Sequence, residues 1–240
     1  MKDKCDTAVI LCAGRGTRLG ELTENFPKCL LPVGEKSILE RAIRGFLDYG
    51  VERFIIVVGY CANMVINTAN NITNNVVPVI NPIYARTNTL VSLWYARDYL
   101  TNGFWLLNGD VLFDPVSLHR FSDGQSSEIG IISAVCGDEE VKAKVDSMGR
   151  VIALSKDITT QDALGEFIGL AKFGKDFSQE FILSLNEWQL RPEVEKQYFE
   201  AAIEMAIRVK PLYIVKLDGL KCIEIDTQED YFRAQQLMGE

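Results

Sequence analysis

A glycine-rich loop with cationic neighbours is the first segment whose residue types could do chemistry. The sequence GRGTRLG at 14–20 follows the apolar run 8–13, and Lys28 comes shortly after it. Glycines let backbone N–H groups approach phosphate oxygens, while Arg15, Arg18 and Lys28 supply positive charge. The segment therefore predicts a phosphate site. It is not a dinucleotide-binding fingerprint, because Leu19 stands where the third glycine belongs, and it lacks the Gly-Lys-Ser/Thr of a P-loop.

Two aspartates each follow an apolar, strand-like run. Asp110 comes after the run 104–107 and the pair Asn108-Gly109, and Asp226 comes after the short run 222–225. The ends of parallel strands converge at one edge of a sheet, so we expect both carboxylates to share a hard Mg²⁺ ion with phosphate oxygens. Two structural alternatives stay open. Asp110 could be a turn residue after glycine, and Asp226 could be the N-cap of a helix that begins at Thr227.

The elements that must position these residues follow an α/β pattern. Buried strand-like runs alternate with helical patterns, which predicts a Rossmann-like three-layer sandwich around a mostly parallel, mixed sheet, with 1–240 as a single domain. A capping box at 37–40 and Gly50 bound the first helix. The expected strands are 8–13, 54–58, 76–80, 104–107, 129–135, 141–145, 151–154, 168–173, 214–217 and 222–225. The other expected helices are 89–99, 177–187, 195–208 and 227–237.

The composition excludes several classes of protein. The chain has 240 residues, of which 48% are hydrophobic and 24% charged, close to the globular average. A net charge of −8 argues against nucleic acid and anionic membrane surfaces as partners. No stretch has the length of a transmembrane helix or the pattern of a signal peptide, so we expect a soluble cytoplasmic protein. The only histidine, His119, is expected to be structural, on a surface helix after Asp114-Pro115.

The cysteines show no C-x-x-C spacing, and several lie inside apolar runs, where a thiol acts as a small hydrophobe. We expect all of them to be reduced. They are Cys5, Cys12, Cys29, Cys61, Cys136 and Cys222.

These segments, taken in order, resemble the nucleotidyl transferase family that makes sugar nucleotides and related activated head groups. The resemblance is carried by 11–19, 22–23, 27–28, 31–33 and 38–40, then by Asn108-Gly109-Asp110 and Glu224-Ile225-Asp226, and so covers nearly the whole chain. It implies that Asp110 and Asp226 hold Mg²⁺ and that Lys28 and Arg18 complete the catalytic set. An acceptor oxygen would attack the α-phosphate of a nucleoside triphosphate and expel pyrophosphate, without an enzyme nucleophile. The implied nucleotide contacts are Leu11, Ala13, Gly14, Gly16, Thr17, Arg18, Asn81, Thr87 and Asn88.

The segment 81–93 narrows the resemblance to a subgroup. Sugar-1-phosphate members usually carry a Gln-Pro-x-Gly-Leu-Ala segment here, whereas this chain has NPIYARTNTLVSL. That pattern is similar to the bacterial cytidylyltransferases for phosphocholine and 2-aminoethylphosphonate. It implies CTP and a small amine-bearing phosphate or phosphonate as substrates. Carboxylates and an aromatic face would suit the amine. The candidates for acceptor binding are Glu166, Tyr198, Glu200 and Glu224.

Competing interpretations remain for these residues and for the whole chain. Tyr198 has the helical spacing of a core residue, and Glu200 could lie on a solvated face. Lys144 and Lys156 are further possible phosphate contacts, although such lysines are usually exposed. A sugar-1-phosphate nucleotidyltransferase is the main alternative function. A glycosyltransferase is expected to show an Asp-x-Asp pair after the fourth strand, and a non-catalytic nucleotide sensor is expected to lose Lys28 or one of the two aspartates.

Overall fold

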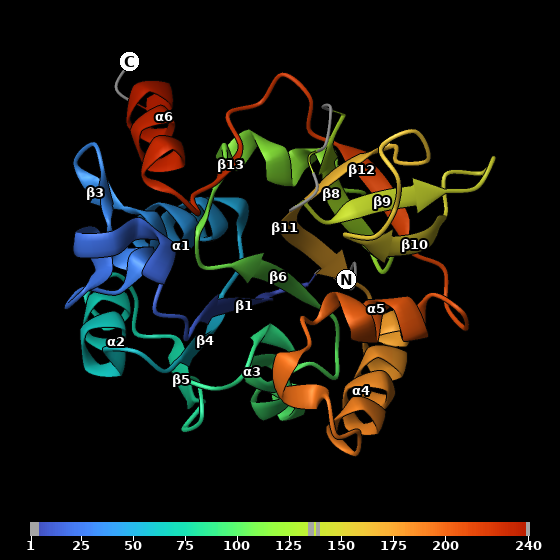
Figure 1. Ribbon diagram of the computed structural model, residues 1–240, viewed down its shortest axis with the longest axis horizontal. Coiled ribbons are helices and arrows are strands. Elements are labelled where there is room, and N and C mark those ends of the chain that lie inside the picture. Colours follow the sequence, from blue (N-terminus) through green and yellow to red (C-terminus); the bar gives the residue numbers. More distant parts are fainter. Residues whose placement is uncertain (1–4, 134–136, 138–139, 239–240) are drawn as a thin grey trace.

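One mixed sheet forms the centre of the protein. The computed structural model describes residues 5–133, 137 and 140–238. In this part of the chain, nine strands form a sheet in the order β10-β9-β11-β6-β1-β4-β5, with β8 paired to β11 and β12 paired to β8. The pairs β6-β1, β1-β4 and β4-β5 are parallel, while β11 runs antiparallel to β6, β8 and β9. Helices lie on both sides of the sheet (Figure 1), which confirms the expected α/β class.

The strands of this sheet are β1 (Thr7–Cys12), β4 (Arg53–Val58), β5 (Val76–Ile80), β6 (Phe104–Asn108), β8 (Glu128–Ile132), β9 (Lys142–Val145), β10 (Val151–Ser155), β11 (Gly165–Phe173) and β12 (Tyr213–Lys216). The helices are α1 (Ile38–Tyr49), α2 (Ala62–Asn70), α3 (Thr89–Tyr95), α4 (Lys175–Gln189), α5 (Glu200–Ala206) and α6 (Gln228–Met238). Short 3-10 helices cover Thr17–Thr23, Lys28–Leu30, Arg97–Tyr99, Pro115–Arg120 and Val194–Lys196.

Strand β1 is buried on both faces, and its alternate residues belong to two different cores. Val9 and Leu11 pack in the core that contains α3, α4 and α5. Ala8 and Ile10 pack in the core that contains α1 and α2. A period of two along a strand sends successive side chains to opposite faces, so an all-apolar run is what a central strand of a three-layer fold requires. The end of this strand is thereby fixed firmly beneath the glycine-rich loop.

Helix α1 begins and ends where its local sequence directs. The Ser37 hydroxyl accepts a hydrogen bond from the backbone N–H of Glu40 at 3.1 Å. Gly50 terminates the helix with a left-handed φ of 99°. An N-cap serine and a C-terminal glycine satisfy the free backbone groups at the two helix ends.

A separate small sheet lies beside the main one. Its two strands are β7 (Val111–Leu112) and β13 (Ile223–Glu224), which pair antiparallel. A short hairpin is formed by β2 (Pro32–Val33) and β3 (Lys36–Ser37). An apolar cluster joins β7, β13, α6 and the glycine-rich loop through Leu19, Leu112, Ile225 and Ala234. This cluster ties the last quarter of the chain to the first.

Several expected element bounds are wrong. The helix expected at 89–99 ends at Tyr95 and continues only as a 3-10 turn. The helix expected at 195–208 begins only at Glu200, because α3 holds the segment before it in another conformation. The backbone N–H of Asn88 donates to the carbonyl of Glu195, and that of Leu90 donates to the carbonyl of Gln197. Helix α2 was not expected at all, since only two of its residues, Val65 and Ala69, are buried and they make a short apolar stripe. Residues 134–135 of the strand expected at 129–135 lie outside the described part.

The described cysteines, Cys5, Cys12, Cys29, Cys61 and Cys222, are all free thiols, and Cys136 lies outside the described residues. Within the part of the chain that the structure describes, no helix combines the length and apolar character needed to cross a bilayer. His119 is exposed on the 3-10 helix Pro115–Arg120, where its ring packs edge-on against Tyr49.

Candidate active site

A cavity of about 780 Å³ opens where β1 and β6 end. It lies at the carboxyl ends of adjacent parallel strands, the position at which open α/β sheets bind ligands. The predicted site residues that line it are Leu11, Gly14, Gly16, Thr17, Arg18, Lys28, Asn88, Asp110, Glu166, Tyr198, Glu200, Glu224 and Asp226. Residues from both halves of the chain therefore meet in one site.

The glycine-rich loop turns sharply after β1 and then forms the 3-10 helix Thr17–Thr23. Gly16 has a left-handed φ of 66°, and a Cβ there would lie 2.9 Å from the Cβ of Lys28. Glycine is therefore required both for the backbone conformation and for the close approach of the lysine. The Thr23 hydroxyl donates to the Gly16 carbonyl at 2.8 Å and closes the turn. The space beside Gly14 is open to the approach of a ligand.

The three cations of this segment have different positions. Lys28 and Arg18 line the cavity, whereas Arg15 turns away from it. The Arg15 guanidinium lies over the Tyr60 ring, 5.2 Å from its centroid. Only two of the three cations that were expected to serve the phosphate site therefore face it.

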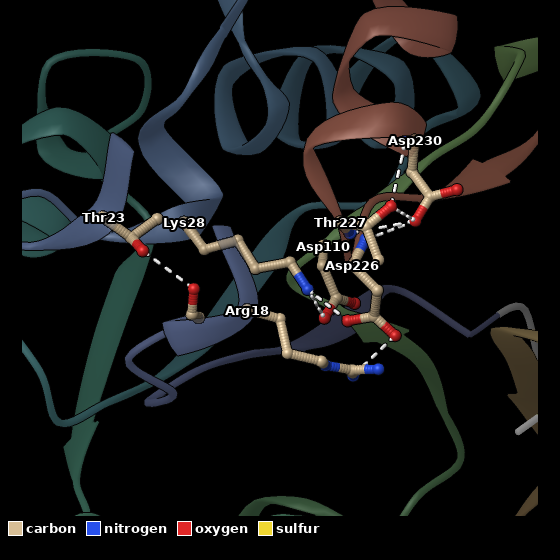
Figure 2. Close-up of polar contacts among 8 residues, drawn as sticks. Arg18, Thr23, Lys28, Asp110, Asp226, Thr227 and Asp230 are labelled. Carbon is tan, nitrogen blue, oxygen red and sulfur yellow. Dashed lines mark hydrogen bonds and ion pairs between the residues drawn. The ribbon is translucent and has the colours of Figure 1, made fainter. Parts of the chain in front are cut away.

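An ion-pair network joins Lys28, Arg18 and the two aspartates (Figure 2). The Lys28 ammonium lies 2.9 Å from Asp110 Oδ2 and 2.6 Å from Asp226 Oδ1. The Arg18 guanidinium lies 2.7 Å from Asp226 Oδ2. The lysine side chain is 10% exposed and the arginine 59%, so the Lys28 pairs are much less screened by solvent. The aspartates that were inferred from strand ends thus share one lysine.

The two aspartates reach this point by different routes. Asp110 follows β6, where the N–H of Gly109 donates to the Leu11 carbonyl at 3.0 Å. A Cβ at position 109 would lie 2.5 Å from that carbonyl oxygen, so only glycine permits the approach. Asp226 follows β13, which belongs to the small antiparallel sheet, so the expectation that both aspartates end strands of one parallel sheet is wrong for Asp226. The hydrogen bond from Ile225 N–H to the Asp110 carbonyl at 3.1 Å brings them together instead.

The Asp226 carboxylate is not the cap of α6. Thr227 and Asp230 cap the helix instead. The Thr227 hydroxyl accepts a hydrogen bond from the Asp230 N–H at 3.2 Å, and Asp230 Oδ2 accepts one from the Thr227 N–H at 2.9 Å. Asp230 Oδ2 also accepts from the Asp226 N–H at 3.2 Å. This reciprocal pair is a capping box with aspartate as its acid. The helix-capping alternative for Asp226 therefore has no support in the hydrogen bonds.

Three carboxylates are arranged as ligands for a hard cation. One oxygen each from Asp110, Glu224 and Asp226 lies within 4.8 Å of the others. Asp110 Oδ1 is buried and has no hydrogen-bond partner, which leaves it available as a ligand. Carboxylate oxygens suit Mg²⁺, so the residues present fit that ion. Glu224, which was predicted on the acceptor side, lies with the metal candidates.

The charges of this cluster perturb one another. Burial by itself would lower the pKa of Lys28, but the carboxylates of Asp110 and Asp226 outweigh burial and raise it. Burial would raise the pKa of Asp226, but Lys28 and Arg18 hold it below its usual value. Burial, followed by the charges of Asp110 and Asp226, raises the pKa of Glu224 well above the ordinary range. Lys28 is therefore charged, and additional positive charge would be needed to keep Glu224 ionised.

The other predicted acceptor residues line the same cavity. Burial raises the pKa of Glu166 to about 7, with Glu140 as the next cause. Burial also raises the pKa of Glu200 to about 7; Lys156 acts against this shift and Asp110 adds to it. Tyr198 is 47% exposed, so it is not the core residue that its spacing allowed. Lys156 lines the cavity, while Lys144 forms an exposed ion pair with Asp162 at 3.0 Å.

Three predicted nucleotide contacts do not line the cavity: Ala13, Asn81 and Thr87. Asn81 is completely buried. Its amide donates to the Thr87 hydroxyl at 3.1 Å and to the Ser92 hydroxyl at 3.0 Å. The Asn81 donors therefore shape the loop that presents Asn88, and a contact of Asn81 with the nucleotide stays a prediction.

Sequence reasoning missed further polar residues of the cavity wall. Asn108 lines it with a buried Oδ1 that has no hydrogen-bond partner. Asp230 and Arg233 reach it from α6. Asn108 stands within the Asn-Gly-Asp motif, and Asp230 completes a Thr-x-x-Asp capping pattern, so both had a local signal. Arg233 had none.

The fold agrees with the comparison with known proteins. The chain belongs to the family of MobA-like NTP transferase domains, which it matches over residues 8–167. It is 26% identical, over 96% of this chain and 97% of the relative, to a choline-phosphate cytidylyltransferase from Streptococcus pneumoniae. It is 37% identical to a CMP-5'-(3-aminopropyl)phosphonate synthase from Streptomyces rubellomurinus, over 48% of this chain and 19% of that protein.

A solved structure has the same fold over almost the whole length. The CTP:phosphocholine cytidylyltransferase from Streptococcus pneumoniae superposes with a TM-score of 0.83, covering 98% of this chain and 99% of its own, at 22% identity. The chain is therefore a nucleotidyltransferase with the Rossmann-like fold of that family.

Proposed function

We propose that the protein joins CMP from CTP to a small amine-bearing phosphate or phosphonate, with Mg²⁺ as cofactor and pyrophosphate as the second product. The observation that carries this proposal is the charge of the cavity wall, where carboxylates outnumber cations. The carboxylates are Asp110, Glu140, Glu166, Glu200, Glu224, Asp226 and Asp230, and the cations are Arg18, Lys28, Lys156 and Arg233. A divalent cation and an ammonium-bearing acceptor would hold these carboxylates ionised and offset their charge.

The reaction needs positioning and charge neutralisation rather than an enzyme nucleophile. An acceptor oxygen attacks the α-phosphorus of CTP, the new P–O bond forms, and the bond to the oxygen that bridges to the β-phosphorus breaks. That bridging oxygen leaves as part of pyrophosphate and takes the electron pair. Lys28 and Arg18 are the cations available to the phosphates, and the open space at Gly14 admits the triphosphate near the backbone. Bound Mg²⁺, held by Asp110 and Asp226, would supply further positive charge to the phosphate oxygens.

The choice of CTP and of an amine-bearing acceptor is supported by the two relatives named above and by Glu166 and Glu200 in the cavity wall. The main alternative is a hexose 1-phosphate acceptor, whose hydroxyls would donate hydrogen bonds to these carboxylates without offsetting their charge. A non-catalytic nucleotide sensor is expected to lose Lys28 or one of the two aspartates. Here all three residues are present and form one ion-pair network.

A pyrophosphate-release screen tests the proposal. The four common nucleoside triphosphates are each paired with phosphocholine, phosphoethanolamine, 2-aminoethylphosphonate and glucose 1-phosphate. We expect turnover with CTP and an amine-bearing acceptor, and loss of turnover on full chelation with EDTA. A higher kcat/KM for glucose 1-phosphate than for every amine-bearing acceptor would refute the acceptor class, and full activity in EDTA would refute the metal.

A further inference from the structure

Glu200 places a carboxylate oxygen without a partner inside the cavity. The residue is the first of α5, is only 8% exposed and lines the cavity. Its Oε2 atom is buried and has no hydrogen-bond partner. A buried acceptor that stays unpaired is costly to the fold, and more so when it is ionised. The position therefore fits a ligand that brings an N–H or O–H donor.

The aromatic residues of the cavity wall are few and already engaged. Within the described lining they are Phe167 and Tyr198. The Phe167 ring packs edge-on against Phe199, with centroids 6.2 Å apart at 87°. The Lys156 ammonium lies over the Tyr198 ring, 5.4 Å from its centroid. No aromatic residue occurs among the residues outside the described part, 1–4, 134–136, 138–139 and 239–240.

These two observations distinguish between kinds of amine. A quaternary ammonium has no N–H bond and is typically recognised by a cage of several aromatic faces. A primary ammonium has three N–H donors and pairs best with carboxylate oxygens. The cavity offers an unpaired carboxylate oxygen and lacks a cage among its described lining residues, since one of its two rings already carries a lysine.

We infer, resting on the proposed function, that the acceptor carries a primary ammonium rather than a trimethylated one, and that Glu200 determines this specificity by accepting an N–H hydrogen bond from it. A site built around a hydrogen bond rejects an analogue that lacks the donor, because its own buried acceptor is then left unpaired. A bound cation would also hold Glu200 ionised against the burial that raises its pKa.

The test compares two acceptors that differ only in N-methylation, phosphoethanolamine and phosphocholine. Turnover with CTP and Mg²⁺ is measured as kcat/KM for each, with the full chain. We expect the wild-type protein to favour phosphoethanolamine by at least about tenfold, the loss that follows from one unmade hydrogen bond to a charged group. Glu200→Gln should lower kcat/KM for phosphoethanolamine by a similar factor, through the acceptor KM, and lower that for phosphocholine by less, so that the ratio of the two acceptors falls. The KM for CTP should not change.

Glu204→Gln is the matched control. Glu204 lies one turn further along α5 and accepts from the Leu154 N–H at 3.1 Å, outside the cavity. Its substitution should leave the ratio of the two acceptors unchanged, whatever it does to stability.

The outcomes separate this inference from the function on which it rests. If phosphocholine is the better substrate of the wild-type protein, or if Glu200→Gln leaves the ratio unchanged, the inference is wrong while an amine-bearing acceptor still stands. If neither is used and a hexose 1-phosphate is, both are wrong. The wild-type ratio also decides the matter if Glu200→Gln fails to fold.

Discussion

Replacing Asp226 by asparagine separates its proposed catalytic role from a structural one. The carboxylate accepts from Lys28 at 2.6 Å on one oxygen and from Arg18 at 2.7 Å on the other. Asparagine keeps one acceptor oxygen but turns an NH₂ group toward the second cation and loses the charge. Removing one charge-stabilising group from a preorganised site lowers kcat by about 10²–10³, or about 2.7–4 kcal/mol of barrier. We expect that loss for Asp226→Asn, together with weaker binding of Mn²⁺ measured by electron paramagnetic resonance.

The same substitution should change the free energy of unfolding much less than the barrier. Helix α6 is capped by Thr227 and Asp230, and the loss of the two ion pairs of Asp226 is offset by weaker repulsion on Glu224, whose pKa Asp226 helps to raise. Asp114→Asn is the control, because that residue caps a 3-10 helix by accepting from the Val116 N–H at 3.0 Å and asparagine caps equally well. Single-turnover rates and thermal unfolding are measured for both variants. An Asp226→Asn protein within a few-fold of wild-type activity would refute the assignment.

Three further perturbations have expected outcomes. Lys28→Met removes the cation between two carboxylates and should lower kcat by about 10²–10³ in a pyrophosphate-release assay. A variant that keeps full kcat would contradict the proposed role of Lys28 in charge neutralisation. Asn81→Ala breaks three side-chain hydrogen bonds and should reduce the free energy of unfolding by about 1–3 kcal/mol in urea titration. An unchanged midpoint would show that these bonds are dispensable. Because Glu200 has a pKa raised to about 7 in the folded state, its contribution to stability is present at low pH and is lost as the pH rises through about 7. Glu200→Gln should therefore raise the melting temperature relative to wild type at pH 8, with a smaller gain at pH 5, and a lower melting temperature at pH 8 would contradict this sign.

Local signals were sufficient for the first part of the fold. The apolar run of β1 predicts a buried strand from a few neighbouring residues, and the serine and glycine at the ends of α1 predict its bounds. Both elements form as expected. The start of α5 could not be predicted in this way, because its preceding turn is held by hydrogen bonds to α3, more than a hundred residues earlier in the chain. Tertiary contacts of this kind override helical periodicity.

The candidate site shows the same division. Residue types and strand ends led to Asp110, Asp226 and Lys28, which the structure brings into one network. The pairing of β13 with β7 could not be seen, because strands of two residues carry no periodicity. Glu224 and Asn81 were both assigned from a family pattern, and such a pattern does not tell which side chain lines the cavity, as Glu224 does, and which is buried, as Asn81 is.

The placement of Asp226 just after β13, near the end of the chain, has a consequence for when the site can exist. The ion pair between Lys28 and Asp226 joins residues that lie 198 positions apart in the chain. The ion pair between Lys28 and Asp110 joins residues that lie 82 positions apart. During synthesis, Lys28 and Asp110 leave the ribosome long before Asp226, and the family match at 8–167 contains the first two but not the third. Closing so long a loop costs chain entropy, and the packing of the C-terminal elements offsets this cost. The charge set is therefore complete only in chains that have finished folding, so catalytic competence reports the integrity of the whole molecule.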